Sequence, residues 1–138
     1  MSKSLIIPFI DPEEPLLPGI EKIIRARAQE LLSFADGARK GGPEQVHDMR
    51  VACRRLLSVL KMFRGAVNVK YGRQLKKIFR ALQDVRECDV FINTLNKFRE
   101  KNGRSPAARL AAEYAKKRRS AATRLVKTID GTDLKVFK

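Results

Sequence analysis

The sequence contains no tryptophan, a single histidine and only two cysteines. Zinc sites take four ligands that are mostly cysteine and histidine, so this composition argues against a metal centre. The cysteines, Cys53 and Cys88, lack the spacing of a metal or redox motif. We expect both to be reduced thiols, with Cys53 packed in the core.

Catalytic motifs are also missing. The sequence contains no Gly-x-x-x-x-Gly-Lys-Ser/Thr loop, and its acidic residues are scattered rather than clustered. The only histidine, His47, has Asp48 as its one nearby carboxylate, and a helix would point that side chain elsewhere. We therefore expect a protein that is not an enzyme and that uses neither a metal nor a cofactor.

No apolar run approaches the roughly 20 residues that a membrane-spanning helix requires. The apolar stretch at 4–10, SLIIPFI, is short and interrupted by proline, unlike a signal peptide. The sequence also has no strand-like alternation of any length. Hydrophobic residues make up 43% and charged residues 33% of the chain, a composition typical of globular domains. We expect a helical, soluble and cytoplasmic protein.

Acidic residues are scarce, with 15 against 30 lysines and arginines, which gives a net charge of +15. The excess lies in 43–138, where 24 residues are basic and nine acidic, whereas 1–42 is neutral. A charge of this size repels itself unless a polyanion or solvent screens it. The composition therefore indicates nucleic acid, an anionic membrane or a phosphate polymer as partner.

Proline and glycine divide the chain into helical segments. Four of the six prolines fall in residues 1–18 and predict an extended arm. Glycines at 41–42 and the Ser105-Pro106 pair are typical helix boundaries. The predicted helices span residues 19–39, 43–64, 67–101 (with a bend near 84–88) and 106–129, and are followed by a tail at 130–138. Short connections between four helices predict an all-α fold, an antiparallel four-helix bundle over residues 19–129.

Two of these helices carry regular apolar seams, with spacings of three and four residues. The seam of the second helix comprises Val46, Met49, Cys53, Leu56, Leu60 and Phe63. The seam of the third helix comprises Leu75, Ile78, Phe79, Leu82 and Val85. We expect both seams to form the core.

A row of cations lies immediately beside the seam of the second helix. At about 100° per residue, the row falls in a stripe roughly 60° wide, and it consists of His47, Arg50, Arg54 and Lys61. A second row, roughly 80° wide, follows the third helix and consists of Lys70, Arg73, Lys77 and Arg80. Each row alone fits a solvated basic edge, but two rows beside two seams predict one shared basic groove.

Arg118 falls on the apolar face of the last helix. Because an unpaired buried charge is costly, its guanidinium must reach either a bound anion or a carboxylate, with Asp84 and Asp89 as candidates. Arg124 flanks it and would share the same groove. Arg86 and Asp89 are three residues apart, so we expect them to form a structural polar pair on one helical face.

The stretch VHDMRVACRRLLSVLKMF (46–63) resembles the signature helix of the CHAD family, the conserved histidine α-helical domain. The stretch LKKIFRALQDVRECDVFINTL (75–95) is similar to the family's second signature, and AKKRRSAATRL (115–125) is a weaker third match. The resemblance covers about residues 20–128. It implies an all-helical fold that binds inorganic polyphosphate in a basic channel, with association with polyphosphate granules as an expected location.

By position, the resemblance implies a set of ligand residues: His47, Arg50, Arg54, Lys61, Arg73, Lys77, Arg80 and Arg118, with Arg124 beside them. Leu57 departs from the family, which often has arginine there, and this implies weaker binding. Family members usually contain two four-helix halves, so a homodimer that rebuilds a two-halved channel is a further hypothesis.

Two alternatives remain at the level of sequence. A nonspecific RNA- or DNA-binding protein fits the charge, although the aromatic residues that single strands stack on are scarce. A helical module that presents its basic face to an acidic protein fits equally.

Overall fold

The computed structural model describes residues 7, 11–13, 15–64, 69–102 and 106–132. Its helices are α1 (Leu16–Ser33), α2 (Ala35–Arg39), α3 (Pro43–Met62), α4 (Val69–Asn102) and α5 (Ala107–Asp130). The described residues contain no strand, so the predicted all-α class is confirmed. Most of the predicted arm and tail lies outside the described residues.

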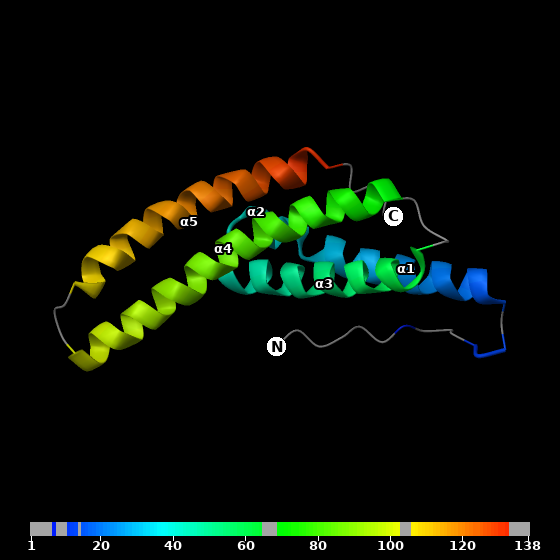
Figure 1. Cartoon of the computed structure of the whole chain (residues 1–138), viewed down its shortest axis with the longest axis horizontal. Coiled ribbons are helices and arrows are strands. Elements are labelled where there is room, and N and C mark those ends of the chain that lie inside the picture. Colours follow the sequence, from blue (N-terminus) through cyan, green and yellow to red (C-terminus); the bar gives the residue numbers. More distant parts are fainter. Residues whose placement is uncertain (1–6, 8–10, 14, 65–68, 103–105, 133–138) are drawn as a thin grey trace.

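The long helices pack on one another in chain order (Figure 1). The main contacts join α1 to α3, α3 to α4 and α4 to α5, while the short α2 lies against α3 and α5. α4 and α5 run in opposite directions and extend together past the end of α3, to the left in Figure 1. This order places α3 and α4 at the centre, with the edge between them available for a site.

The two predicted seams form the core. Val46, Met49, Cys53 and Leu56 on α3 are fully buried, as are Leu75, Ile78, Leu82 and Val85 on α4. Leu31 of α1 and Leu125 of α5 join them. Phe63 is only half-buried because α3 ends at Met62 and Phe63 is its C-cap. Phe79 is half-buried as well, and packs against the core from its margin.

The helix predicted over 19–39 is in fact two helices. α1 begins at Leu16, three residues earlier than expected, and ends at Ser33. The chain turns at Phe34, whose N–H donates to the carbonyl of Leu31 at 3.2 Å. Asp36 and Gly37, both weak helix formers, follow this turn, and α2 is only five residues long.

Two further local features bear on the site. Gly41, after α2, has a φ of +80°, a conformation that glycine adopts without the steric cost other residues meet. α4 continues through 84–88 as one helix, and it curves along its length where a bend was predicted (Figure 1).

Both cysteines are free and buried, as predicted for Cys53. Burial raises the pKa of the Cys53 thiol to about 12. Burial, with the carboxylates of Asp89 and Asp84 nearby, also raises the pKa of Cys88. Since the thiolate is the nucleophile, neither cysteine is activated for chemistry at neutral pH.

Candidate functional site

A cavity of about 680 Å³ lies between α3 and the first half of α4. Five of its lining residues are cationic, and none of the described residues that line it is acidic. The cationic residues are Arg54, Lys61, Arg64, Arg73 and Lys76. The lining of this cavity is therefore strongly basic.

Helical spacing explains why these side chains meet. On α3, Arg54, Leu57 and Lys61 follow one another at intervals of three and four residues, so they share one face. On α4, Arg73, Lys76 and the neighbouring Phe79 recur in the same way. Leu57, Leu60 and Phe79 supply apolar wall between the charges, because each helix turns the margin of its buried seam toward the cavity.

Arg50 continues the α3 row by one turn but is held against α4. Its Nε donates to Gln83 Oε1 at 2.5 Å, and its guanidinium carbon lies 5.6 Å from the centroid of the Phe79 ring. Gln83 in turn donates to Glu87 Oε1 at 2.9 Å. His47, one further turn away, is half-buried. Both residues share the helical stripe of Arg54, and neither lines the cavity.

A second cavity, of about 600 Å³, lies between α4 and α5. Its charges are mixed: the carboxylates of Asp84 and Glu87 come from α4, and the cations come from α5. Those cations are Lys116, Lys117 and Arg124. Arg124 therefore lies in a different cavity from Arg54, and the single groove predicted for both does not contain both.

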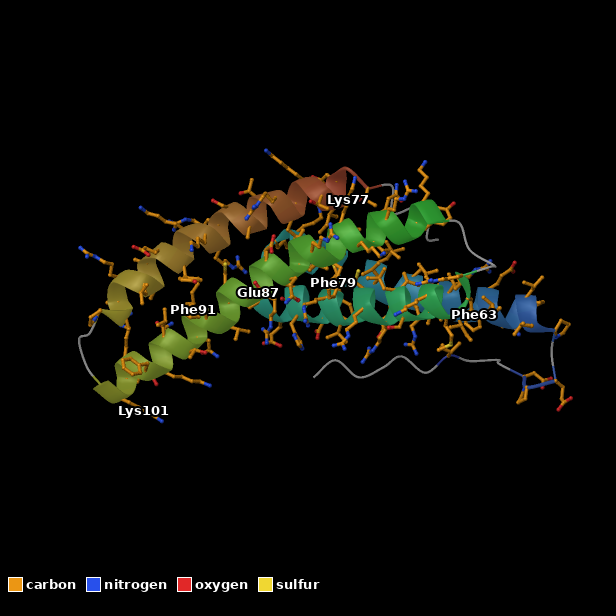
Figure 2. All side chains as sticks on the ribbon, in the orientation of Figure 1. Phe63, Lys77, Phe79, Glu87, Phe91 and Lys101 are labelled. Atoms are coloured by element: carbon orange, nitrogen blue, oxygen red, sulfur yellow. The ribbon has the colours of Figure 1, made fainter. Side chains whose placement is uncertain are left out.

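Lys77 and Arg80 are exposed and line neither of these two cavities. Figure 2 shows the reason for Lys77, which lies on the other edge of α4 from Phe79, the residue between α4 and α3. Arg80 shares the helical face of Arg73 but lies two turns further along α4. Only Arg73 of the three ligand residues predicted on α4 lines the cavity.

Arg118 is bound to protein groups. Its Nε donates to Asp89 Oδ1 at 2.9 Å, and its terminal nitrogen donates to the Gly41 carbonyl at 2.6 Å. The side chains of Arg118 and Asp89 are 20% and 13% exposed. The carboxylate alternative considered for Arg118 is the arrangement observed, and this pair ties α5 to α4 and to the turn before α3.

The polar pair predicted between Arg86 and Asp89 is therefore corrected. Asp89 lies where α4 meets α5, so the long side chain of Arg118 reaches it from the facing helix. The structure records no ion pair between Arg86 and Asp89 within the described part of α4.

Comparison with models of known protein families identifies the family of this chain. The chain matches the CHAD domain over residues 22–138. It belongs to the CHAD family. CHAD domains are known in polyphosphate-binding proteins in general. Neither the curated proteins nor the solved structures yield a significant match.

Within the described part of this CHAD chain, no three histidine, cysteine or acidic residues gather as a metal site would require. The same residues contain no helix with the length and apolarity needed to cross a membrane.

The sequence pattern misses two cationic residues of the cavity, Arg64 and Lys76. Lys76 stands three residues before Phe79, which faces α3, and that spacing is the signal that could have found it. Arg64 follows Lys61 by three residues, just beyond the end of α3, so the same spacing applies there.

We expect Arg118→Ala to lower the free energy of unfolding by about 2–3 kcal/mol, because it leaves the largely buried Asp89 without its cation. Polyphosphate affinity should change less than about threefold in this variant, because Arg118 does not line the cavity. A larger loss of affinity would require a direct contact with the polymer. Urea unfolding and a binding titration measure the two quantities. Full stability together with lost affinity would instead make Arg118 a ligand residue.

Proposed function

We propose that this CHAD protein binds inorganic polyphosphate without catalysing its turnover, and that the polymer lies in the cavity between α3 and α4. The observation that carries the proposal is the gathering of five cations from two helices in one cavity that no described acidic residue lines. Membership of the CHAD family supports the choice of polyphosphate among polyanions.

The chemistry of the polymer suits this row of side chains. Polyphosphate offers closely spaced negative charges and no base edges, and cations on successive helical turns are about 5–6 Å apart. Arginine pairs phosphate oxygens bidentately and keeps its charge. Each charge-assisted contact contributes on the order of 1.5–3 kcal/mol. Four or five of them, after desolvation and ordering costs, support micromolar affinity.

The row of cations on α3 continues along the helix beyond the cavity. The Nε of Arg50 donates to Gln83. Its two terminal nitrogens remain as donors toward a polymer that leaves the cavity along α3. His47 follows one turn later on the same stripe. In this arrangement Arg54, Lys61 and Arg73 make the principal contacts, while Arg50 and His47 contact phosphates only of longer chains.

A competition between long-chain polyphosphate and single-stranded RNA of matched charge tests the proposal. At about 150 mM salt, phosphate contacts of a nonspecific kind are strongly weakened, so we expect polyphosphate to bind in clear preference. Equal binding of the two polymers, lost together as salt rises, would mean that the +15 charge acts as a general polyanion surface and that nucleic acid is the better candidate.

We also propose that two copies associate through the part of α4 and α5 that extends past α3 (Figure 1). Phe91, Phe98 and Leu110 there are 38%, 52% and 41% exposed. Acids of α4 and cations of α5 line the cavity between these two helices. A two-fold axis would set the acids of one copy against the cations of the other, which makes the surface self-complementary.

Light scattering at micromolar concentration should therefore give twice the monomer mass of 15.7 kDa. The variant Phe98→Asp with Leu110→Asp should give the monomer mass, because a charge in an apolar interface is not compensated; Phe91 is left in place because its ring packs on Tyr114 of α5. A wild-type protein that is monomeric at these concentrations contradicts the proposal.

A further inference from the structure

The cavity between α3 and α4 has an apolar part as well as a cationic part. Leu57, Leu60 and Phe79 line it together with the five cations. Inorganic polyphosphate has no apolar surface, so it contacts the cations and leaves this wall without a complementary group. A ligand that carries a planar apolar group next to its phosphates would contact both parts of the cavity.

We propose that this cavity binds nucleoside polyphosphates, with the base against Phe79 and Leu57 and the phosphates on the surrounding cations. The inference concerns the same site as the proposed function and rests on its anion-binding role. The volume of about 680 Å³ falls within the range of small-molecule sites, roughly 300–1,000 Å³. A lipid phosphate would need a longer apolar wall than these three side chains provide.

Phe79 contributes part of its ring surface to the cavity wall. It is half-buried, and the guanidinium of Arg50 holds it through a cation–π contact, with 5.6 Å between the guanidinium carbon and the ring centroid. Aromatic rings stack on nucleobases with little dependence on which base is present. Among the described residues of the wall, the one side-chain hydroxyl is that of Ser58, which donates to the carbonyl of Arg54 at 3.0 Å. We therefore expect ATP and GTP to bind about equally.

Leu57 is the residue that distinguishes a nucleotide site from a plain polyanion site. It follows Arg54 by one turn and precedes Lys61 by one turn, so it interrupts the row of cations in the cavity wall. An arginine at this position would continue the row. A leucine instead gives apolar surface where a base would lie between two groups of phosphate-binding side chains.

Calorimetric titrations with ATP and with inorganic tripolyphosphate, in the same buffer without divalent cations, test the proposal. Tripolyphosphate carries at least as much charge as ATP, so electrostatics alone favours it. We expect ATP to bind the wild-type protein about tenfold more tightly, which is the low end of a stacking contribution. Equal affinities, or tighter binding of tripolyphosphate, would overturn the inference.

The variant Leu57→Arg is the second measurement, since this half-buried position in the cavity wall accepts a long side chain more readily than Phe79 accepts truncation. We expect tripolyphosphate to gain about tenfold and the preference for ATP to disappear. A preference for ATP that survives this change would place the base elsewhere and overturn the inference.

Long-chain polyphosphate, titrated into the same protein, separates the two proposals. Tight polyphosphate binding without a preference for ATP over tripolyphosphate removes the nucleotide inference and keeps the proposed function. Failure of every phosphate ligand to bind removes both.

Discussion

Reversing two charges in the cavity, Arg54→Glu with Lys61→Glu, is expected to weaken polyphosphate binding by roughly 100-fold or more. Each substitution removes one charge-assisted contact and adds a carboxylate that repels the polymer. Both side chains are exposed at the cavity edge, so neither substitution disturbs the core. The measurement is an equilibrium titration with long-chain polyphosphate at about 150 mM salt, where nonspecific phosphate contacts are weak.

The matched control is Arg25→Glu with Arg119→Glu. These arginines are exposed on α1 and α5 and line neither cavity, yet their reversal changes the net charge by the same amount. We expect less than about a threefold loss in this control, because distant charges are largely screened at this ionic strength. Equal losses in the two double variants would show that total charge, rather than the cavity, determines binding.

Helical periodicity was sufficient to predict the core and most of the elements. The spacing of Val46, Met49 and Cys53 identifies the buried face of α3 correctly because burial follows the 3.6-residue repeat directly. Proline also located the start of α3 at Pro43. The turn at Phe34 was not predicted, since the apolar pattern continues across it and only Asp36 and Gly37 weaken the helix there.

The site was harder to predict because a helix has two edges beside its seam. A helical wheel for α4 does not show which edge of the seam faces α3 and which faces α5. The predicted row of cations therefore contained Lys77, whereas the cavity contains Lys76. One residue turns a side chain by about 100°, enough to move it from the cavity to solvent. Pairing between helices decides the difference, and that pairing is a property of the assembled fold.

The same reasoning applies to Arg118. Its place on an apolar face indicated that it needs an anion, and both a ligand and a carboxylate met that need. Only the packing of α5 on α4 brings Asp89 within 2.9 Å. The charge of a residue is thus readable from sequence, whereas its partner depends on contacts between segments that are distant in the chain.

Glu30→Ala is expected to lower the free energy of unfolding by about 3–5 kcal/mol, the largest stability effect we predict. Glu30 is a buried carboxylate of α1, 6% exposed. Arg27 Nη1 lies 3.1 Å from its Oε2, and Arg55 Nη1 of α3 lies 2.8 Å from its Oε1. The substitution leaves two guanidinium groups, 15% and 26% exposed, at the contact between α1 and α3 without that carboxylate.

A loss of this size is a large fraction of the 5–15 kcal/mol that stabilises a typical domain, and urea unfolding followed by circular dichroism measures it. The triple variant Arg27→Met, Glu30→Met and Arg55→Met should recover most of the loss, because apolar side chains of similar volume then replace the whole ion-paired group at little cost. A loss below about 1 kcal/mol for Glu30→Ala, the range of an exposed pair, would contradict the prediction. Recovery in the triple variant, with polyphosphate affinity unchanged, would assign Arg55 to the scaffold that holds α3 in place and leave Arg54, its neighbour in sequence, to the cavity.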